Sequence, residues 1–186
     1  MKFKFYLFYF PILFLLLNFS LANLIIEKNS RFLINFYSEI HLVVNAQENK
    51  NNKKINLLYQ QFQVGDFEVY VNGNKDESCD KQCKLSEDRI KIDLIFKNKI
   101  NTCELMFNGL KNIIEVDLSD FDTSEVKSMK QMFYDCTKLE KIKFGKVNTS
   151  SVENMESIFD GCSELTSIDL SYLDTSKVTT MKKYVL

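Results

Sequence analysis

Residues 106–131 read MFNGLKNIIEVDLSDFDTSEVKSMKQ, and residues 132–157 read MFYDCTKLEKIKFGKVNTSSVENMES. Residues 158–183 read IFDGCSELTSIDLSYLDTSKVTTMKK, so the same pattern returns in register every 26 residues. A fixed period of about 20 to 50 residues is typical of stacked supersecondary units that bury their apolar faces against one another. The sequence therefore predicts three stacked units, which we call repeat 1, repeat 2 and repeat 3 in chain order.

Each repeat carries two apolar patterns. Leu139, Ile142 and Phe144 have the spacing of the strand in leucine-rich repeats. The second pattern favours one apolar stripe on a short helix, and it consists of Val126, Met129, Met132, Phe133, Cys136 and Leu139. The Asp-Thr-Ser or Asn-Thr-Ser cluster before it suits a turn and a helix N-cap. These patterns predict an α/β solenoid of leucine-rich-repeat type, with parallel strands, one short helix per 26-residue coil, and Phe107, Phe133 and Phe159 stacked.

The run M-F-x-x-C-x-x-L-x-x-I-x-L-S-x-x-D-T-S-x-V-x-x-M, most complete at residues 158–181, resembles the repeat of BspA-like leucine-rich-repeat surface proteins. A similar repeat occurs in mycoplasma surface lipoproteins. The likeness covers residues 90–183, and repeat 2 departs from it where Gly145 follows Phe144. The resemblance implies a right-handed solenoid that serves adhesion or recognition at the cell surface without catalysis. It supplies no agreed binding residues.

The N-terminal segment has the three-part form of a secretory signal peptide. Lys2 and Lys4 precede a long apolar run, and Ser20-Leu21-Ala22 offers small residues at a cleavage site. Residues 1–22 are therefore predicted to be removed, with an uncleaved signal anchor as the alternative. We expect a secreted or extracellular cell-surface protein whose mature form holds no membrane segment.

Residues 23–89 are predicted to form a β-rich capping region that covers the first face of the array with a small sheet. Residues 39–44 and 67–71 are rich in apolar and β-branched residues, and the second run ends at Asn72-Gly73. Residues 90–105 are interpreted as a shortened first repeat, because Ile92-Asp93-Leu94 matches Val116-Asp117-Leu118. His41 is expected to have a structural role.

The five cysteines fall into two groups, those at apolar repeat positions and those in a polar loop. Cys103, Cys136 and Cys162 fall on apolar repeat positions, which predicts buried free thiols. Cys79 and Cys83 lie in a polar loop that would be oxidised after export, which favours a local disulfide. Zinc binding is the alternative, but two further ligands are lacking. We expect no metal and no cofactor.

The outward strand positions of a solenoid line its concave face, where such proteins bind. The sequence predicts a ligand-binding surface there, made of Glu115, Asp117, Ser119, Lys141, Lys143, Ser167, Asp169 and Ser171. The register puts Asp117 beside Lys143 and Lys143 beside Asp169, so cross-strand charge pairs are a compatible role. Separately, Asn148-Thr149-Ser150 is a glycosylation sequon in an exported protein.

The formal net charge is −1, from 24 basic and 25 acidic residues. This balance predicts neither a nucleic acid partner nor attraction to an anionic membrane. The favoured function is a non-enzymatic protein-binding or adhesion module at a cell surface, with a protein partner. An incomplete structural or assembly fragment of a larger repeat protein is the alternative, because the chain stops inside a repeat with residues 184–186 as a tail. That uncapped end also predicts self-association. A secreted hydrolase is the remote alternative, since the single histidine, His41, lies outside the repeats.

Overall fold

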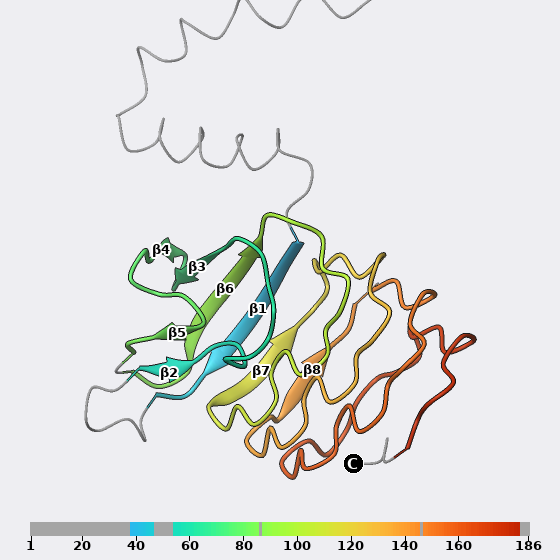
Figure 1. The fold of residues 1–186 in the computed structure, drawn as a ribbon. Helices are drawn as coiled ribbons and strands as arrows, with labels where there is room; N and C mark the ends of the chain where they lie inside the picture. The colour runs from blue at the N-terminus through green and yellow to red at the C-terminus, as the bar shows by residue number, and fades with distance from the viewer. Residues whose placement is uncertain (1–37, 47–53, 86, 146, 183–186) are drawn as a thin grey trace, which may run out of the picture. The chain divides into compact units, whose positions relative to one another are not determined.

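The computed structural model describes residues 38–46, 54–85, 87–145 and 147–182. Two sheets form within these residues (Figure 1). The smaller one pairs β2 (Ile55–Asn56) with β5 (Gln82–Cys83). The larger one has six strands: β1 (Ser38–Val44), β3 (Phe67–Val71), β4 (Asn74–Lys75), β6 (Ile90–Phe96), β7 (Ile113–Asp117) and β8 (Lys141–Lys143).

Strand β1 lies between β6 and β7 and is antiparallel to both, in the sheet order β4-β3-β6-β1-β7-β8. Strands β7 and β8 are parallel, with Val116 opposite Ile142, as the repeat register predicts. Along β1 every second side chain, including Ile40 and Leu42, is buried, because successive side chains of a strand point to opposite faces. The side chains between them face the other side of the sheet, which we call the open face.

The predicted α/β solenoid of leucine-rich-repeat type is wrong. The described residues contain no helix, and their main sheet is mixed rather than all parallel. The strand of the expected first repeat does not pair with repeat 1, because β1 separates Ile92 on β6 from Val116 on β7. Its second half does lie beside repeat 1, where Cys103 N donates to Ser128 O at 2.8 Å. Within the N-terminal region, β1, β3 and β4 join the same sheet as the repeats, whereas β2 and β5 form the separate small one.

The reason that the described repeats contain no helix lies in the backbone conformation at two recurring positions. A right-handed helix needs uninterrupted negative φ, and a positive φ interrupts it. Here positive φ recurs at intervals of 26 residues, at Leu105, Gln131 and Ser157 and again at Gly109, Asp135 and Gly161. Single hydrogen-bonded turns lie between these breaks, such as Met132 N to Met129 O at 3.2 Å. Consecutive turns place apolar residues three or four apart, which is also the helical spacing.

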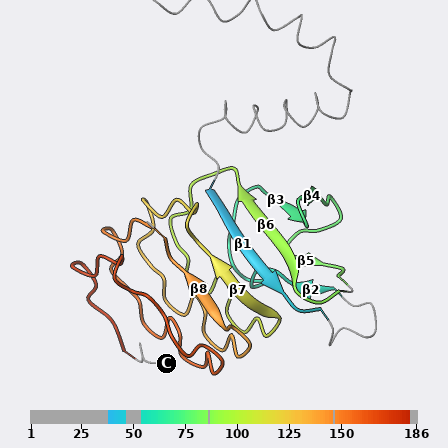
Figure 2. The same ribbon diagram turned by 180° about the vertical axis from the view of Figure 1, so that it is seen from behind.

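Backbone groups that a helix would use internally join one repeat to the next. Phe107 N donates to Met132 O at 2.9 Å, and Phe133 N donates to Ile158 O at 3.0 Å. Successive repeats therefore lie side by side along much of their length, as both views of the ribbon show (Figure 1, Figure 2). The stacking expected from the 26-residue period is confirmed, although the units are built from turns rather than helices.

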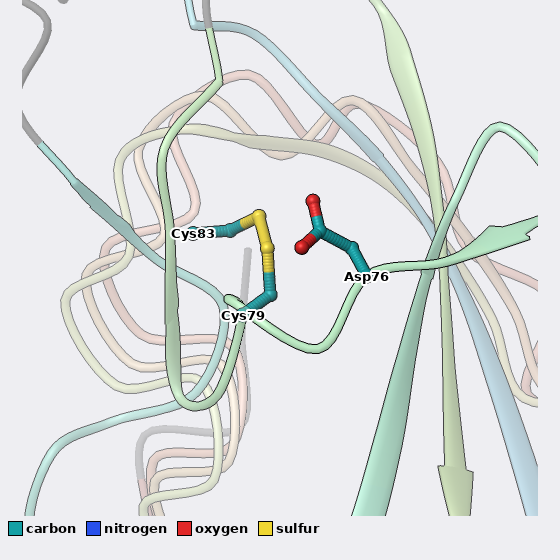
Figure 3. Close-up of side chains that lie close together, drawn as sticks. All are labelled: Asp76, Cys79 and Cys83. Atoms are coloured by element: carbon teal, nitrogen blue, oxygen red, sulfur yellow. A yellow bond between two sulfur atoms is a disulfide. The ribbon is translucent and has the colours of Figure 1, made fainter.

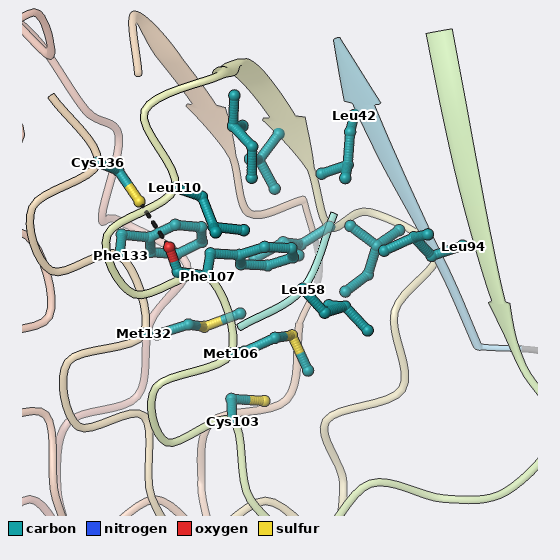
Figure 4. Packing of buried hydrophobic residues seen from close by; sticks show 14 of the residues in the cluster. Leu42, Leu58, Leu94, Cys103, Met106, Phe107, Leu110, Met132, Phe133 and Cys136 are labelled. Atoms are coloured by element: carbon teal, nitrogen blue, oxygen red, sulfur yellow. Dashed lines mark hydrogen bonds between the residues drawn. The ribbon is translucent and has the colours of Figure 1, made fainter. Parts of the chain in front are cut away.

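The core of the stack contains the predicted column of phenyl rings. The rings of Phe107 and Phe133 stack with centroids 5.4 Å apart, and those of Phe133 and Phe159 stack at 5.9 Å. Figure 4 shows the first pair with Cys136, whose thiol donates to Phe107 O at 3.0 Å. Cys162 makes the same bond to Phe133 O at 3.0 Å. These thiols and Cys103 are free and buried, as predicted.

The Asp-Thr-Ser clusters cap no helix and instead tie neighbouring repeats together. The Asp122 carboxylate accepts a hydrogen bond from Ser124 N at 2.9 Å, which makes a local turn. The buried hydroxyl of Thr123 donates to Asn148 O at 2.8 Å, and that of Thr149 donates to Asp174 O at 3.1 Å. The turn part of the prediction is confirmed and the N-cap part is wrong.

In the N-terminal region the predicted strands correspond to β1 and β3, and Asn72 and Gly73 form the turn after β3 with φ of 50° and 83°. Such a turn needs positive φ at both central residues, which asparagine and glycine tolerate best. The predicted signal peptide and its cleavage site lie outside the described residues. Within the described ranges no helix has the length and apolarity to cross a membrane.

Candidate binding face of the sheet

The open face is hollowed where β6, β1, β7 and β8 lie next to one another. The hollow has a volume of about 320 Å³. It is lined by His41, Leu42, Val43, Lys91, Asp93, Glu115, Val116, Asp117, Lys141 and Lys143. The sequence predicted Glu115, Asp117, Lys141 and Lys143 as binding residues, and the structure brings these four together here.

Two rows of side chains cross the hollow, because strand pairing aligns them. In the first row Asp93 lies opposite His41, His41 opposite Asp117, and Asp117 opposite Lys143. In the second row Lys91 lies opposite Val43, Val43 opposite Glu115, and Glu115 opposite Lys141.

His41 is the centre of the first row. Its Nδ1 is 2.7 Å from Asp93 Oδ1, and its Nε2 is 3.4 Å from Asp120 Oδ2. The hydrogen bond to Asp93 raises the pKa of His41 to about 9, against a smaller opposing effect of burial and with help from Asp120. The imidazole is therefore a cation at neutral pH. It holds β1 to β6 and to the segment after β7, which agrees with the structural role expected for it.

Asp117 and Lys143 form the predicted cross-strand pair, with 3.0 Å between Lys143 Nζ and Asp117 Oδ2. Burial acts to raise the pKa of Asp117, but hydrogen bonds from Ser119 and from Lys143 outweigh it and lower that pKa. Asp117 is therefore an anion whose two oxygens are already engaged, one by Ser119 N at 2.8 Å and one by Lys143.

The second row contains an engaged anion and two unpaired cations. The Glu115 carboxylate pairs with Arg89. The side chains of Lys91 and Lys141 are exposed, and in the described part of the chain neither has an ion-pair or hydrogen-bond partner. Between them Val43 offers a partly exposed apolar surface.

The other four predicted binding residues do not line the hollow. The Ser119 hydroxyl is buried without a hydrogen-bond partner among the described residues, and it lies against Gly145. Ser167, Asp169 and Ser171 are exposed in repeat 3. The Asp169 carboxylate accepts a bond from Ser171 N at 2.9 Å, and across the described ranges it forms no ion pair with Lys143.

The structure joins Cys79 and Cys83 in a disulfide, with the Asp76 carboxylate nearby (Figure 3). Cysteine binds zinc as a thiolate, and sulfurs bonded to each other are not thiolates. Asp76 instead accepts hydrogen bonds from Ser78 N at 2.9 Å and Ser78 Oγ at 2.6 Å, and these bonds lower its pKa. The disulfide therefore links two nearby points of one loop covalently, and its sulfurs are not metal ligands.

Asn148, the predicted glycosylation site, is exposed, but its side-chain oxygen already accepts bonds from Ser150 N at 3.1 Å and Ser150 Oγ at 2.7 Å. The residue therefore serves a turn after β8 within repeat 2, and glycosylation there stays a prediction.

The residues missed from sequence are His41, Val43, Lys91 and Asp93, which β1 and β6 bring to the hollow. For Asp93 a signal existed, because Ile92-Asp93-Leu94 repeats the pattern that places Asp117 on an outward position. No signal indicated that β1 would pair between the two.

Taken together, the described residues define a mixed β protein with stacked repeats, an apolar column inside and a charged hollow on its open face. Residues 84–185 match the model of a family described as Mycoplasma protein of unknown function, DUF285. This match spans more than half of the chain, and the chain belongs to that family. The family description names neither leucine-rich repeats nor BspA. No curated protein and no solved structure matches the chain.

Proposed function

We propose that this chain is a non-enzymatic, exported protein-binding module that engages a protein partner through the open face of its sheet. The observation that carries this proposal is the hollow of about 320 Å³, whose charged rim surrounds an apolar centre at Val43. Recognition surfaces commonly combine an apolar centre with a polar rim. The likeness of the repeats to BspA-like surface proteins, and the form of residues 1–22, support a place at or outside the cell surface.

The chemistry at His41 argues against a hydrolytic role. A general base must be unprotonated at the working pH, and a pKa near 9 keeps this imidazole charged. Its Nε2 also faces the Asp120 carboxylate rather than a hydroxyl or thiol nucleophile. The buried thiols are held protonated, because burial raises the pKa of Cys162 to about 11 and that of Cys136 further.

The test places a photo-crosslinking amino acid at Val43, inside the hollow, and at Lys84, an exposed position that does not line it. We expect one or a few surface proteins to crosslink at position 43 and not at position 84. Each captured protein is then purified and its affinity measured directly. Equal capture at both positions, or loss of binding on purification, would refute the proposal.

We also propose self-association through repeat 3, on the basis of its exposed apolar side chains. Met155 is fully buried, whereas Met181, its equivalent in repeat 3, is 41% exposed. Thr149 is buried by its bond to the next repeat, and its equivalent Thr175 is exposed. A second copy brings matching apolar groups to this surface.

A further inference from the structure

We infer that the partner of the hollow is an acidic polypeptide segment in which two carboxylates, four residues apart, reach Lys91 and Lys141. This inference rests on the proposed function and specifies the chemistry of the partner.

The groups that line the hollow leave positive charge without a partner. With His41 protonated, the lining holds four cationic and three anionic side chains. Each anion already has a cation: Asp93 has His41, Asp117 has Lys143, and Glu115 has Arg89. The charge that remains for an incoming molecule is therefore positive, and it is located at Lys91 and Lys141. A complementary partner carries negative charge.

The spacing of these two lysines matches that of two side chains on an extended peptide. They lie in one row across the sheet, on β6 and β8, with β1 and β7 between them. Neighbouring strands are about 4.8 Å apart, so the two positions are about 14 Å apart. An extended chain advances about 3.4 Å per residue, and residues i and i+4 therefore span about the same distance.

The apolar surface between the lysines defines the residue that lies between the two carboxylates. In an extended peptide, residues i, i+2 and i+4 point to the same side. When the carboxylates of i and i+4 reach the lysines, the side chain of i+2 lies near Val43. The segment that fits has an acidic residue, an apolar residue two positions later, and an acidic residue two positions after that.

The same spacing argues against a phosphate group as the ligand. Phosphate sites gather several donors around one point, whereas these two cations are separated by about 14 Å with Val43 between them. The side chains that line the hollow carry only one more positive than negative charge, which is too few to neutralise the phosphates of a polyanion such as a nucleic acid.

The experiment measures fluorescence anisotropy of a labelled peptide, Ser-Glu-Ser-Leu-Ser-Glu-Ser, against the full chain produced by secretion. A peptide with both glutamates replaced by glutamine is the matched ligand. The protein variants are Lys91→Gln with Lys141→Gln, and Lys84→Gln as the control lysine outside the hollow. We expect about tenfold weaker binding for the glutamine peptide and for the double variant, since each exposed ion pair contributes up to about 1 kcal/mol. We expect no change for the control.

Equal binding of the two peptides, or an equal effect of the control lysine, overturns the inference. Tighter binding of a phosphoserine peptide that depends on the same two lysines also overturns it, in favour of phosphate recognition. The inference can also fail while the proposed function stands: if a partner captured at position 43 binds the double variant as tightly as the unaltered chain, the face binds protein but not through acidic residues. Circular dichroism of each variant verifies that it is folded.

Discussion

Replacement of Gly145 by alanine tests how closely repeat 1 and repeat 2 pack. Gly145 has φ of 60°, and a Cβ there would lie 2.5 Å from Ser119 Oγ and 2.6 Å from Ser119 Cα. Alanine at positive φ costs about 1 kcal/mol, and forcing a methyl group into packed surroundings costs about 1–3 kcal/mol more. Gly109→Ala is the matched control, because Gly109 has φ of 68° with nothing within 4 Å of the added atom.

We therefore expect Gly145→Ala to lower the free energy of unfolding by about 1–3 kcal/mol more than Gly109→Ala does. Urea unfolding followed by far-ultraviolet circular dichroism, with the disulfide kept oxidised, measures both losses. Adding Ser119→Gly should restore part of the loss in Gly145→Ala, since it removes the Oγ and Cβ but leaves the backbone in place. Equal losses in the two alanine variants would show that the close approach to Ser119 does not exist.

Four further changes test other parts of the molecule. Phe133→Ala should lower the unfolding free energy by about 3–5 kcal/mol, whereas Tyr134→Ala, at an exposed position, should cost less than about 1 kcal/mol in the same urea assay. The pKa of His41 is raised from 6.5 to about 9, so its stabilising effect is complete below pH 6.5 and disappears as pH rises through 9. The melting temperature should therefore fall as the pH rises across that range, and it should fall less in His41→Gln. The same pH dependence in the variant and the unaltered chain would contradict the pairing of His41 with Asp93. Burial raises the pKa of Cys136, so a thiol reagent should label it at least about a hundredfold faster in urea than in buffer, and rapid native labelling would place the thiol at the surface. Met181→Lys should weaken self-association in sedimentation velocity, and a concentration-independent monomer for the unaltered chain would remove that proposal.

The stacking could be predicted from sequence because a strict period leaves little choice. Residues with the same surroundings recur every 26 positions, so Phe107, Phe133 and Phe159 meet one another whatever the local conformation is. The local conformation could not be predicted from the apolar spacing. Gly109 and Gly161 were available as signals against a helix, but Gln131 and Ser157 adopt positive φ without belonging to a residue type that favours it.

For a similar reason, only one half of the candidate site could be predicted from the sequence. Residues on β7 and β8 follow from the repeat register, so the pairing of Asp117 with Lys143 could be predicted and is observed. The other half comes from pairings between distant segments, with His41 opposite Asp93 across 52 positions of sequence. Pairing order between such strands depends on which apolar faces fit, and no local pattern records it.

The position of β1 also bears on how this family can evolve. An additional unit inserted between repeat 1 and repeat 2 would meet two surfaces that already accept a repeat, through bonds such as Phe107 N to Met132 O. A copy of repeat 1 inserted ahead of it would run parallel to β7 and could pair with β1 in the same antiparallel way that β7 does. Duplication should therefore lengthen members of the family only on the repeat side of β1, leaving the half of the hollow built by β6 and β1 unaltered while the other half diversifies.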